Sequence, residues 1–526
     1  MKAGIANRLH RKFRGAIAVL SAAALVLAFG PSAALAADSS TYQITLTGTT
    51  SGHTYQVYRI FTGDLSSNGQ TLSNVAWDTD SVTYNGTESA KDVAEQLAAD
   101  AAKNPNSDEP IKQLEEKLTL KKPVTTTASS AGTTTIDLSQ FGAGYYLVKD
   151  EDNSVDSSKT DAYTKYIVQV VGNATVNVKS DVPSVYKKVK DINDTEGTQT
   201  GWVDSADYDM GDWIPYEIFG TMPSNIGDYT TYSYAFTDTL SKGLTYDGAN
   251  ADHKAKILLD DKTDVTKYFT EKAETKTDGS TVVTWTCSDL KAAAKEAGAD
   301  LTPGTSVRVY YDAQLNNNAV IGSAGNPNTV KLTYSNNPNK GGEGNTGTTP
   351  EDKVTVFTYK LVVDKVDQNK NKLAGAEFTL VKHMADGTTQ TVAVAASDDG
   401  TEFTFNGLAD GSYTLTETKT PDGYNTIDPI SFSISATHDL ESDDPQLKDL
   451  NGVTSTGAID FGTLYNATVD KDKASISTQI VNRQGSVLPT TGGMGTTVLY
   501  IAGAAIIAAA GFGLYRRHRS RMQDNA

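Results

Sequence analysis

Short segments in which apolar and polar residues alternate recur along most of the chain. Successive side chains of a β-strand point to opposite faces, so this alternation predicts strands with one buried face. Clear examples are 42–46, 216–218, 330–334 and 412–418. Apolar residues at helical spacing occur near 90–98 and 111–118, and a short helix is indicated by Ser288 as its N-cap, alanines at 292–294 and Gly298 past its end. We therefore predict an all-β fold, a row of β-sandwiches with minor helices.

The length of 526 residues and one change of composition divide the chain. At roughly 150 residues per domain, about three domains are expected. Residues 340–350 are rich in glycine and threonine and end in proline, which is typical of a linker. We therefore predict three tandem sandwiches at 37–182, at 183–350 including this linker, and at 351–484.

The first residues have the composition of an export signal. Basic residues between positions 2 and 14 precede an apolar run at 15–29, and Ala34-Leu35-Ala36 forms a small-x-small cleavage site. We therefore predict a signal peptide at 1–36 and a secreted mature chain. That chain has one cysteine, Cys287, so it contains no internal disulfide, and any covalent tie must use other chemistry.

Charge and histidine content narrow the class of function. The formal net charge of -18 argues against nucleic acid and anionic membranes as partners. The six histidines are scattered and show no metal-ligand spacing, so we expect no metal and no cofactor. We find no convergent acid, base and nucleophile of the kind that a hydrolase needs. The chain is expected to be a structural or binding protein and not an enzyme.

Residues 485–526 contain three segments in sequence. The pentapeptide Leu488-Pro489-Thr490-Thr491-Gly492 precedes an apolar run at about 498–514 and four arginines, Arg516, Arg517, Arg519 and Arg521. This order resembles the cell-wall sorting signal that sortases read in Gram-positive bacteria. The resemblance implies a transient membrane intermediate, cleavage between Thr491 and Gly492, and transfer of the Thr491 carboxyl group to an amine.

The third predicted sandwich contains several motifs in order. An early strand reads Leu361-Val-Val363-Asp-Lys365, a later one Tyr413-Thr-Leu415-Thr-Glu417, and the last ends in Ile480-Val-Asn482. These motifs resemble the B-type immunoglobulin-like domain of collagen adhesins and pilins, which forms a spontaneous Lys–Asn isopeptide bond. The resemblance implies Lys365 as the amine, Asn482 as the carboxamide and Glu417 as the catalyst. Lys365 shares parity with Val363 and is expected to point inward, where burial lowers the pKa of an amine and raises that of a carboxyl group.

The second predicted sandwich repeats this logic with an aspartate. Val185, Lys187 and Val189 share strand parity, an acid occurs in Phe236-Thr-Asp238, and a carboxamide occurs in Asn328-Thr-Val330. These segments resemble the A-type isopeptide domain of fimbrial shaft proteins. The resemblance implies Lys187 as the amine, Asp238 as the catalyst and Asn328 as the carboxamide. Lys188 and Asn326 remain alternatives.

A further lysine concerns the joining of one copy of the chain to the next. In sortase-assembled pilins this lysine ends the first domain, in a pattern of Val-x-Val-Tyr-Pro-Lys type. Here Val176-Asn-Val178-Lys179 occupies that place without the Tyr-Pro pair. Lys179 has the opposite parity to both valines, so we expect it to be exposed and available to an enzyme. Lys187 and Lys188 remain alternatives, as does the absence of a polymerising lysine.

These motifs together resemble those of Gram-positive sortase-assembled major pilins. The resemblance implies three immunoglobulin-like sandwiches in a shaft subunit of a covalent pilus, or fimbria, that is anchored to the cell wall and supports adhesion. The implied partners are pilin-class and housekeeping sortases, other copies of the chain, minor pilins, peptidoglycan and a host receptor. The alternative is a monomeric wall-anchored adhesin that binds host matrix or glycan.

Overall fold

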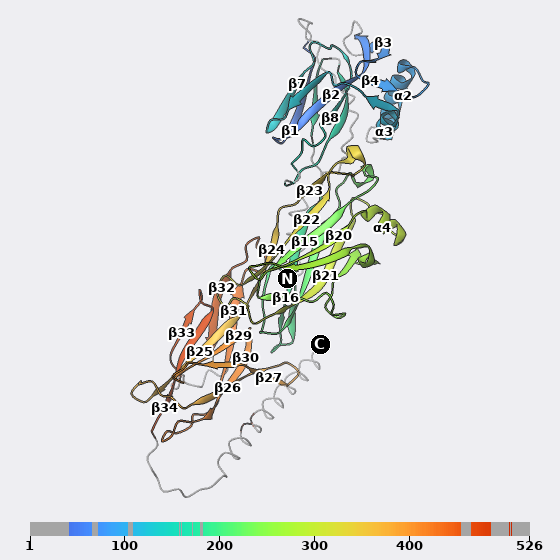
Figure 1. The fold of residues 1–526 in the computed structure, drawn as a ribbon. Helices are drawn as coiled ribbons and strands as arrows, with labels where there is room; N and C mark the ends of the chain where they lie inside the picture. The colour runs from blue at the N-terminus through green and yellow to red at the C-terminus, as the bar shows by residue number, and fades with distance from the viewer. Residues whose placement is uncertain are drawn as a thin grey trace, which may run out of the picture.

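The computed structural model describes residues 41–484, apart from 66–71, 104–108, 157, 159, 171, 179–181 and 454–463, and in addition Ala504 and Ile507. Within these residues the chain forms three strand-rich modules that follow one another along an elongated molecule (Figure 1). Most of the regular structure is β-strand, which confirms the predicted all-β class with minor helices. In the part of the chain that the structure describes, no helix is long and apolar enough to cross a membrane.

The first module packs a small sheet, β10-β1-β7, against a larger one, β3-β2-β8-β9 with β6 beside β2. The strands, including the β4-β5 pair, are β1 (Gln43–Thr49), β2 (Thr54–Leu65), β3 (Leu72–Trp77), β4 (Val82–Tyr84), β5 (Leu118–Leu120), β6 (Thr125–Ala128), β7 (Gly132–Asp137), β8 (Gly144–Asp150), β9 (Lys165–Val170) and β10 (Asn173–Asn177). Helices α2 (Ala90–Lys103) and α3 (Glu109–Glu116) form where helical spacing predicts them. Ser89 caps α2, since its hydroxyl accepts the Asp92 N–H at 3.2 Å.

The second module is a sandwich of two seven-stranded sheets. One has the order β12-β11-β14-β21-β17-β18 with β16 beside β21, and the other has the order β13-β24-β22-β15-β20-β19 with β23 beside β22. The strands are β11 (Val185–Asn193), β12 (Thr198–Val203), β13 (Ser205–Asp207), β14 (Trp213–Thr221), β15 (Tyr234–Leu240), β16 (Leu244–Tyr246), β17 (Lys256–Leu259), β18 (Thr263–Asp264), β19 (Thr270–Thr275), β20 (Thr281–Cys287), β21 (Ser306–Leu315), β22 (Asn326–Ser335), β23 (Thr346–Thr348) and β24 (Asp352–Phe357). The third predicted helix is α4 (Leu290–Glu296). Its N-cap is Asp289 and not the predicted Ser288, because the Asp289 carboxylate accepts two backbone N–H groups of the first turn.

The third module packs the sheet β28-β29-β25-β34-β33 against the sheet β27-β26-β30-β31-β32. The strands are β25 (Tyr359–Asp367), β26 (Glu377–His383), β27 (Thr389–Val392), β28 (Val394–Ala396), β29 (Glu402–Leu408), β30 (Gly411–Lys419), β31 (Ile430–His438), β32 (Leu447–Val453), β33 (Leu464–Asp470) and β34 (Ser475–Asn482). The first strand, β25, and the last, β34, are parallel neighbours. The two ends of this module are therefore adjacent in one sheet.

The boundary predicted at residue 351 differs from the strand pairing. β24 pairs with β22 and β13 and so belongs to the second module, whereas the third module starts with β25. Between the two strands lies Thr358, whose buried hydroxyl donates to the carbonyl oxygen of Leu408 at 3.2 Å. Because 352–367 is an almost continuous run of strand-forming residues, its pattern does not mark where the chain passes from one sandwich to the next.

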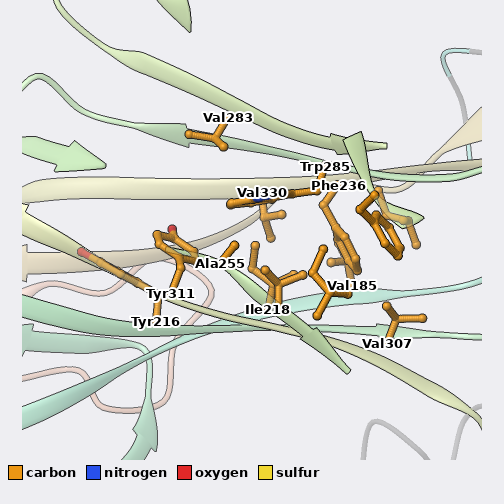
Figure 2. Packing of buried hydrophobic residues seen from close by; sticks show 14 of the residues in the cluster. Val185, Tyr216, Ile218, Phe236, Ala255, Val283, Trp285, Val307, Tyr311 and Val330 are labelled. Atoms are coloured by element: carbon orange, nitrogen blue, oxygen red, sulfur yellow. The ribbon is translucent and has the colours of Figure 1, made fainter. Parts of the chain in front are cut away.

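The core of the second module lies between its two sheets and contains aromatic side chains from both. In Figure 2, Tyr216 of β14 and Tyr311 of β21 lie side by side among aliphatic residues of the cluster. Their rings are stacked, with centroids 5.3 Å apart and planes inclined by 17°. This aromatic pair forms one wall of the polar group described next.

Candidate functional site

Lys187 lies in the interior of the second module. It stands between Val185 and Val189 on β11, and all three side chains face inward because alternate residues of a strand share a face. The side chain is 0 % exposed. Its Nζ donates to Oδ1 of Asp238 on β15 at 2.6 Å and to the hydroxyl of Tyr311 at 2.8 Å. The predicted amine and the predicted acid therefore meet across the sandwich.

Asn328 completes what we call the Lys187 cluster, which consists of Lys187, Asp238, Tyr311 and Asn328. Asn328 of β22 stands directly opposite Leu240 of β15, so it faces the same side as Asp238, two positions earlier on β15. Its Nδ2 donates to the Tyr311 hydroxyl at 2.7 Å, and that hydroxyl donates to the Asp238 carboxylate. The Oδ1 atom of Asn328 is buried and has no hydrogen-bond partner among the described residues.

Burial controls the charge states in this cluster. Desolvation lowers the pKa of Lys187, although the charge of Asp238 opposes that shift. Desolvation also raises the pKa of Asp238, against the effects of Lys187, Tyr311 and Asn328. Both shifts favour a neutral amine beside a protonated acid, which is the combination that attack on a carboxamide requires.

The two alternative residues in this module have other partners. Lys188 points to the opposite face of β11, is 25 % exposed, and contacts the carboxylate of Asp204. Asn326 faces inward, but its side-chain amide is hydrogen-bonded to the backbone of Val320 and Val356 at 2.8–3.2 Å. The geometry brings together Lys187 and Asn328, and not these two.

Lys365, Glu417 and Asn482 form the Lys365 cluster in the third module. The Lys365 side chain is 0 % exposed, and its Nζ lies 3.9 Å from Oε1 of Glu417. Asn482 donates from Nδ2 to Oε2 of Glu417 at 3.0 Å. Oε1 of Glu417 and Oδ1 of Asn482 are buried atoms without hydrogen-bond partners in the described chain. A carboxyl group thus stands within reach of both the amine and the carboxamide.

The strand register explains why Lys365 and Asn482 approach each other. β25 and β34 run parallel, with Lys365 opposite Ile480 and Asp367 opposite Asn482. Asn482 therefore lies two positions beyond the partner of Lys365 on the same face. The amine donates to the Ile480 carbonyl oxygen at 3.2 Å. Burial lowers the pKa of Lys365 to about 8, although the charge of Glu417 acts in the opposite direction.

Several polar groups of the interior were not predicted from the sequence. Tyr311 bridges three members of the Lys187 cluster, yet in the sequence it reads as one more inward residue of an alternating strand. In the first module His53 lies 2.8 Å from both Asp150 and Asp161, within a buried site. Burial by itself lowers the pKa of His53, but the two aspartates raise it to about 10. These contacts join residues that are far apart in the sequence, so no local sequence pattern predicts them.

The contact between the second and third modules, which we call the joint, holds two groups of carboxylates that could accept a cation. Ligand atoms of Asp191, Asp207 and His438 lie within 4.8 Å of one another, as do those of Asp194, Asp209 and Asp212. Burial lowers the pKa of His438, but hydrogen bonds and charges from Asp191 and Asp207 raise it to about 9. Near neutral pH the imidazole is therefore protonated and acts as a counter-ion, not as a metal ligand.

Two predicted elements, Lys179 and the pentapeptide 488–492, lie outside the described residues. The preceding strand β10 is described, and Val176 and the residue after the strand, Val178, are buried. The inward positions predicted for Val176 and Val178 are therefore observed, and the exposure of Lys179 stays a prediction.

Three parts of this chain match models of known families. A Gram-positive pilin backbone subunit 2, Cna-B-like domain matches residues 210–338. A prealbumin-like fold domain matches 359–446, and an LPXTG cell wall anchor motif matches 481–520. The matched ranges cover parts of the second and third modules and the C-terminal signal.

Individual relatives agree with these models. The trypsin-resistant surface T6 protein of Streptococcus pyogenes serotype M6 is 25 % identical over 406 residues, which cover 65 % of this chain and 70 % of that protein. The chain thus carries the domain types and the anchor motif of Gram-positive pilins, and it is similar to the LPXTG-anchored major pilins. The solved T6 backbone pilin of serotype M6 S. pyogenes covers 86 % of this pilin and 100 % of its own chain, with 19 % identity and a TM-score of 0.50. The full-length major pilin SpaD from Corynebacterium diphtheriae covers 85 % of this pilin and 98 % of its own chain, with 19 % identity and a TM-score of 0.43.

The family assigns the pilin its place in the cell. It is a cell-wall-anchored surface protein and a pilus shaft subunit, and its anchor motif makes it a sortase substrate. Pilins of this kind are structural subunits and not enzymes that turn over a substrate. The family matches do not assign the bonds within each copy or the amine that accepts the Thr491 carboxyl group.

Proposed function

We propose that this pilin is cross-linked both within each copy and between copies. Within each copy, Lys187 joins Asn328 and Lys365 joins Asn482. Between copies, the Thr491 carboxyl group joins a lysine of the next subunit, Lys179 in the first instance. The observation that carries the proposal is that each buried lysine lies beside a carboxyl group that also contacts, directly or through Tyr311, the matching asparagine.

The bond in the second module follows from the hydrogen bonds of the Lys187 cluster. Neutral Nζ of Lys187 attacks Cγ of Asn328, a new C–N bond forms, and the bond from Cγ to Nδ2 breaks. Protonated Asp238 gives its proton toward Nδ2 and takes up the proton that the amine loses, since its carboxyl group lies 2.6 Å from Nζ. Tyr311 links Asp238 to Nδ2 and so provides a route by which the departing nitrogen receives a proton. Ammonia leaves and an amide remains.

The bond in the third module uses Glu417 without a tyrosine. Oε1 faces the Lys365 amine at 3.9 Å, and Oε2 accepts from Nδ2 of Asn482 at 3.0 Å. One carboxyl group can therefore take the proton from the attacking amine and deliver one to the leaving nitrogen. Each cluster reacts once, because the amide that it forms removes both reactants.

The intermolecular bond requires an exposed amine and an enzyme. We propose that a pilin-class sortase cuts after Thr491 and transfers it to Lys179 of another copy, with Lys187 and Lys188 as alternatives. We favour Lys179 over these alternatives, because Lys187 is buried beside Asp238 and Lys188 is paired with Asp204. A housekeeping sortase then joins the finished fibre to peptidoglycan. Minor pilins and a host receptor are the remaining proposed partners.

Intact mass of the purified pilin tests the internal bonds. Each Lys–Asn bond removes one ammonia, about 17 Da, so these two bonds contribute about 34 Da to any decrease in mass. Lys187→Ala and Lys365→Ala can each form only one of the two Lys–Asn bonds. When each variant is compared with the mass calculated from its own sequence, its decrease should therefore be about 17 Da smaller than that of the wild type. Lys188→Ala is the matched control and should retain both. A wild-type mass equal to that of the unmodified sequence would overturn the proposal for both clusters.

A further inference from the structure

A lysine and an aspartate from different modules meet at the joint. Lys382 lies on β26 of the third module, and Asp209 lies in the second module between β13 and β14. Lys382 is 2 % exposed and the Asp209 side chain is 5 % exposed. Nζ of Lys382 contacts Oδ2 of Asp209 directly. We infer that these two residues form an isopeptide bond that ties the second module covalently to the third.

The carboxyl group of Asp209 is held in an orientation suited to attack. Its Oδ1 atom accepts the backbone N–H of Ala409 at 2.9 Å and the hydroxyl of Tyr413 at 3.2 Å. Two donors on one oxygen stabilise the negative charge that develops there when an amine adds to Cγ. The other oxygen, Oδ2, faces Lys382 and is the atom that would leave.

Two further acids supply a proton to the leaving oxygen. Oδ2 of Asp194 lies 3.9 Å from the Lys382 Nζ, and Asp212 accepts the backbone N–H of Asp209 at 3.0 Å. Burial raises the pKa of Asp209, and burial together with the charges of Asp209 and Asp194 raises the pKa of Asp212 to about 7. Asp212 therefore holds a proton over part of the neutral range, and Asp194 places one more carboxyl group close to the atoms that react.

The reaction balances without any other reactant. Nζ of Lys382 attacks Cγ of Asp209, the N–C bond forms, and the bond from Cγ to Oδ2 breaks. The amine gives up its protons to the neighbouring carboxyl groups, and these protonate Oδ2, which departs as water. The pair borders a pocket of about 500 Å³ that is also lined by Met210 and Thr404, which offers the water an exit.

The joint positions this pair closely. Met210 donates its N–H to the Gly407 carbonyl oxygen at 3.0 Å, and Ala385 donates to that of Asp194 at 2.8 Å. A Cβ on Gly411 would lie 2.7 Å from Cε of Lys382, so glycine gives the lysine room to pass. Backbone contacts thus fix both partners before reaction, which reduces the entropy that the step must lose.

A second lysine–aspartate contact offers an internal control. Lys188 contacts Asp204, but the lysine is 25 % exposed and Asp204 also accepts the Ser442 N–H at 2.8 Å. Water therefore reaches this pair, which lacks the buried setting of Lys382 and Asp209. Lys188–Asp204 should remain an ordinary ion pair in the same molecule in which Lys382 reacts.

Peptide mapping of the full-length wild-type pilin tests the inference and requires no variant to fold. After denaturation and trypsin digestion, we expect residues 191–242 joined to 373–419, because a modified Lys382 is not cleaved. The joined pair should be lighter than the sum of its peptides by about 18 Da, the mass of water. Stoichiometric recovery of the free peptide 373–382 would overturn the inference.

Two variants separate this bond from the bonds proposed above. Asp209→Ala should release peptide 373–382, while Asp209→Asn should still cross-link, with loss of ammonia, and give a product of the wild-type mass. The Lys187–Asn328 and Lys365–Asn482 peptides are read in the same digests as independent species. Failure at Lys382 therefore leaves those bonds standing, and their failure does not affect this test. Joined peptides containing Lys188 and Asp204 would show that contact alone produces linkage, which contradicts the role given to burial and the acids.

Discussion

At the scale of single residues, Tyr311 occupies the point where the amine, the acid and the carboxamide of the second module converge. Tyr311→Phe removes the hydroxyl but keeps the ring stacked on Tyr216. We expect the Lys187–Asn328 bond to form at least about 10-fold more slowly, because a positioned proton-transfer group contributes about 100-fold or more. The measurement is the intact mass of freshly folded protein followed over time. Tyr216→Phe is the control, and equal rates in the two variants would contradict a role for the Tyr311 hydroxyl.

Glu417 has the corresponding place in the third module, where no tyrosine assists it. Glu417→Gln keeps the size of the side chain but cannot take up a proton from the Lys365 amine. We expect the Lys365–Asn482 bond to be absent, which leaves the protein heavier by about 17 Da than its cross-linked form. Glu377→Gln, at an exposed position on the same sheet, should retain the bond. A cross-linked Glu417→Gln protein would assign the proton transfer to another group.

At the scale of strands, the proposed Lys365–Asn482 bond joins the first and last strands of the third module. Such a tie restricts the unfolded chain as a disulfide does, and a loop on the order of 100 residues corresponds to roughly 4 to 5 kcal/mol. Lys365→Ala should therefore lower the melting temperature of this module by at least about 10 °C. Lys360→Ala, on the outward face of the same strand, is the matched control for calorimetry. An equal loss of stability in both variants would argue against a covalent tie.

Strand patterns predicted much of this site and failed where packing between modules decides. Alternation placed Lys187 inward and Lys188 outward, as the structure has them. Asn326 and Asn328 share parity, so only the strand register and the backbone partners of Asn326 distinguish them. The contact between Asp209 and Lys382 joins two modules, so no local sequence pattern predicts it. The passage from β24 to β25 was missed for the same reason.

The connections between strands of the first module lead to a prediction about pH. His53, just before β2, bridges Asp150 at the end of β8 and Asp161 in the segment before β9. Burial opposes its charge, but the aspartates raise its pKa from 6.5 to about 10. Stability from this group is therefore complete below pH 6.5 and is lost as pH rises toward 10, with a slope of up to about 1.4 kcal/mol per pH unit. Denaturant unfolding across this range measures it, and His53→Gln should remove that slope; a wild-type slope that survives in the variant would assign it to other groups.

At the scale of the whole molecule, the proposed bonds define a path for tension along the fibre. Force that enters at Lys179 reaches β11, crosses from Lys187 to Asn328, passes through β24 into β25, and crosses from Lys365 to Asn482 before it leaves toward Thr491. The segments enclosed by each bond are bypassed. The first module precedes Lys179 in the chain and so lies off this path; among its described residues, His53 is held by ion pairs with Asp150 and Asp161.

This path depends on Lys179 as the acceptor, and the fibre itself provides the test. Cells with the wild-type pilin should yield a ladder of polymers that survives boiling in detergent, since each step is an amide bond. Lys179→Ala should collapse the ladder to monomer while the internal mass decrements persist, because the buried clusters do not involve that residue. Lys188→Ala, as a control, should leave the ladder intact. A ladder unchanged in Lys179→Ala would mean that another lysine is the acceptor. The position of the first module relative to the path of tension would then also differ from the one proposed. No ladder in the wild type would identify the alternative, a wall-anchored monomer in which Thr491 joins only peptidoglycan.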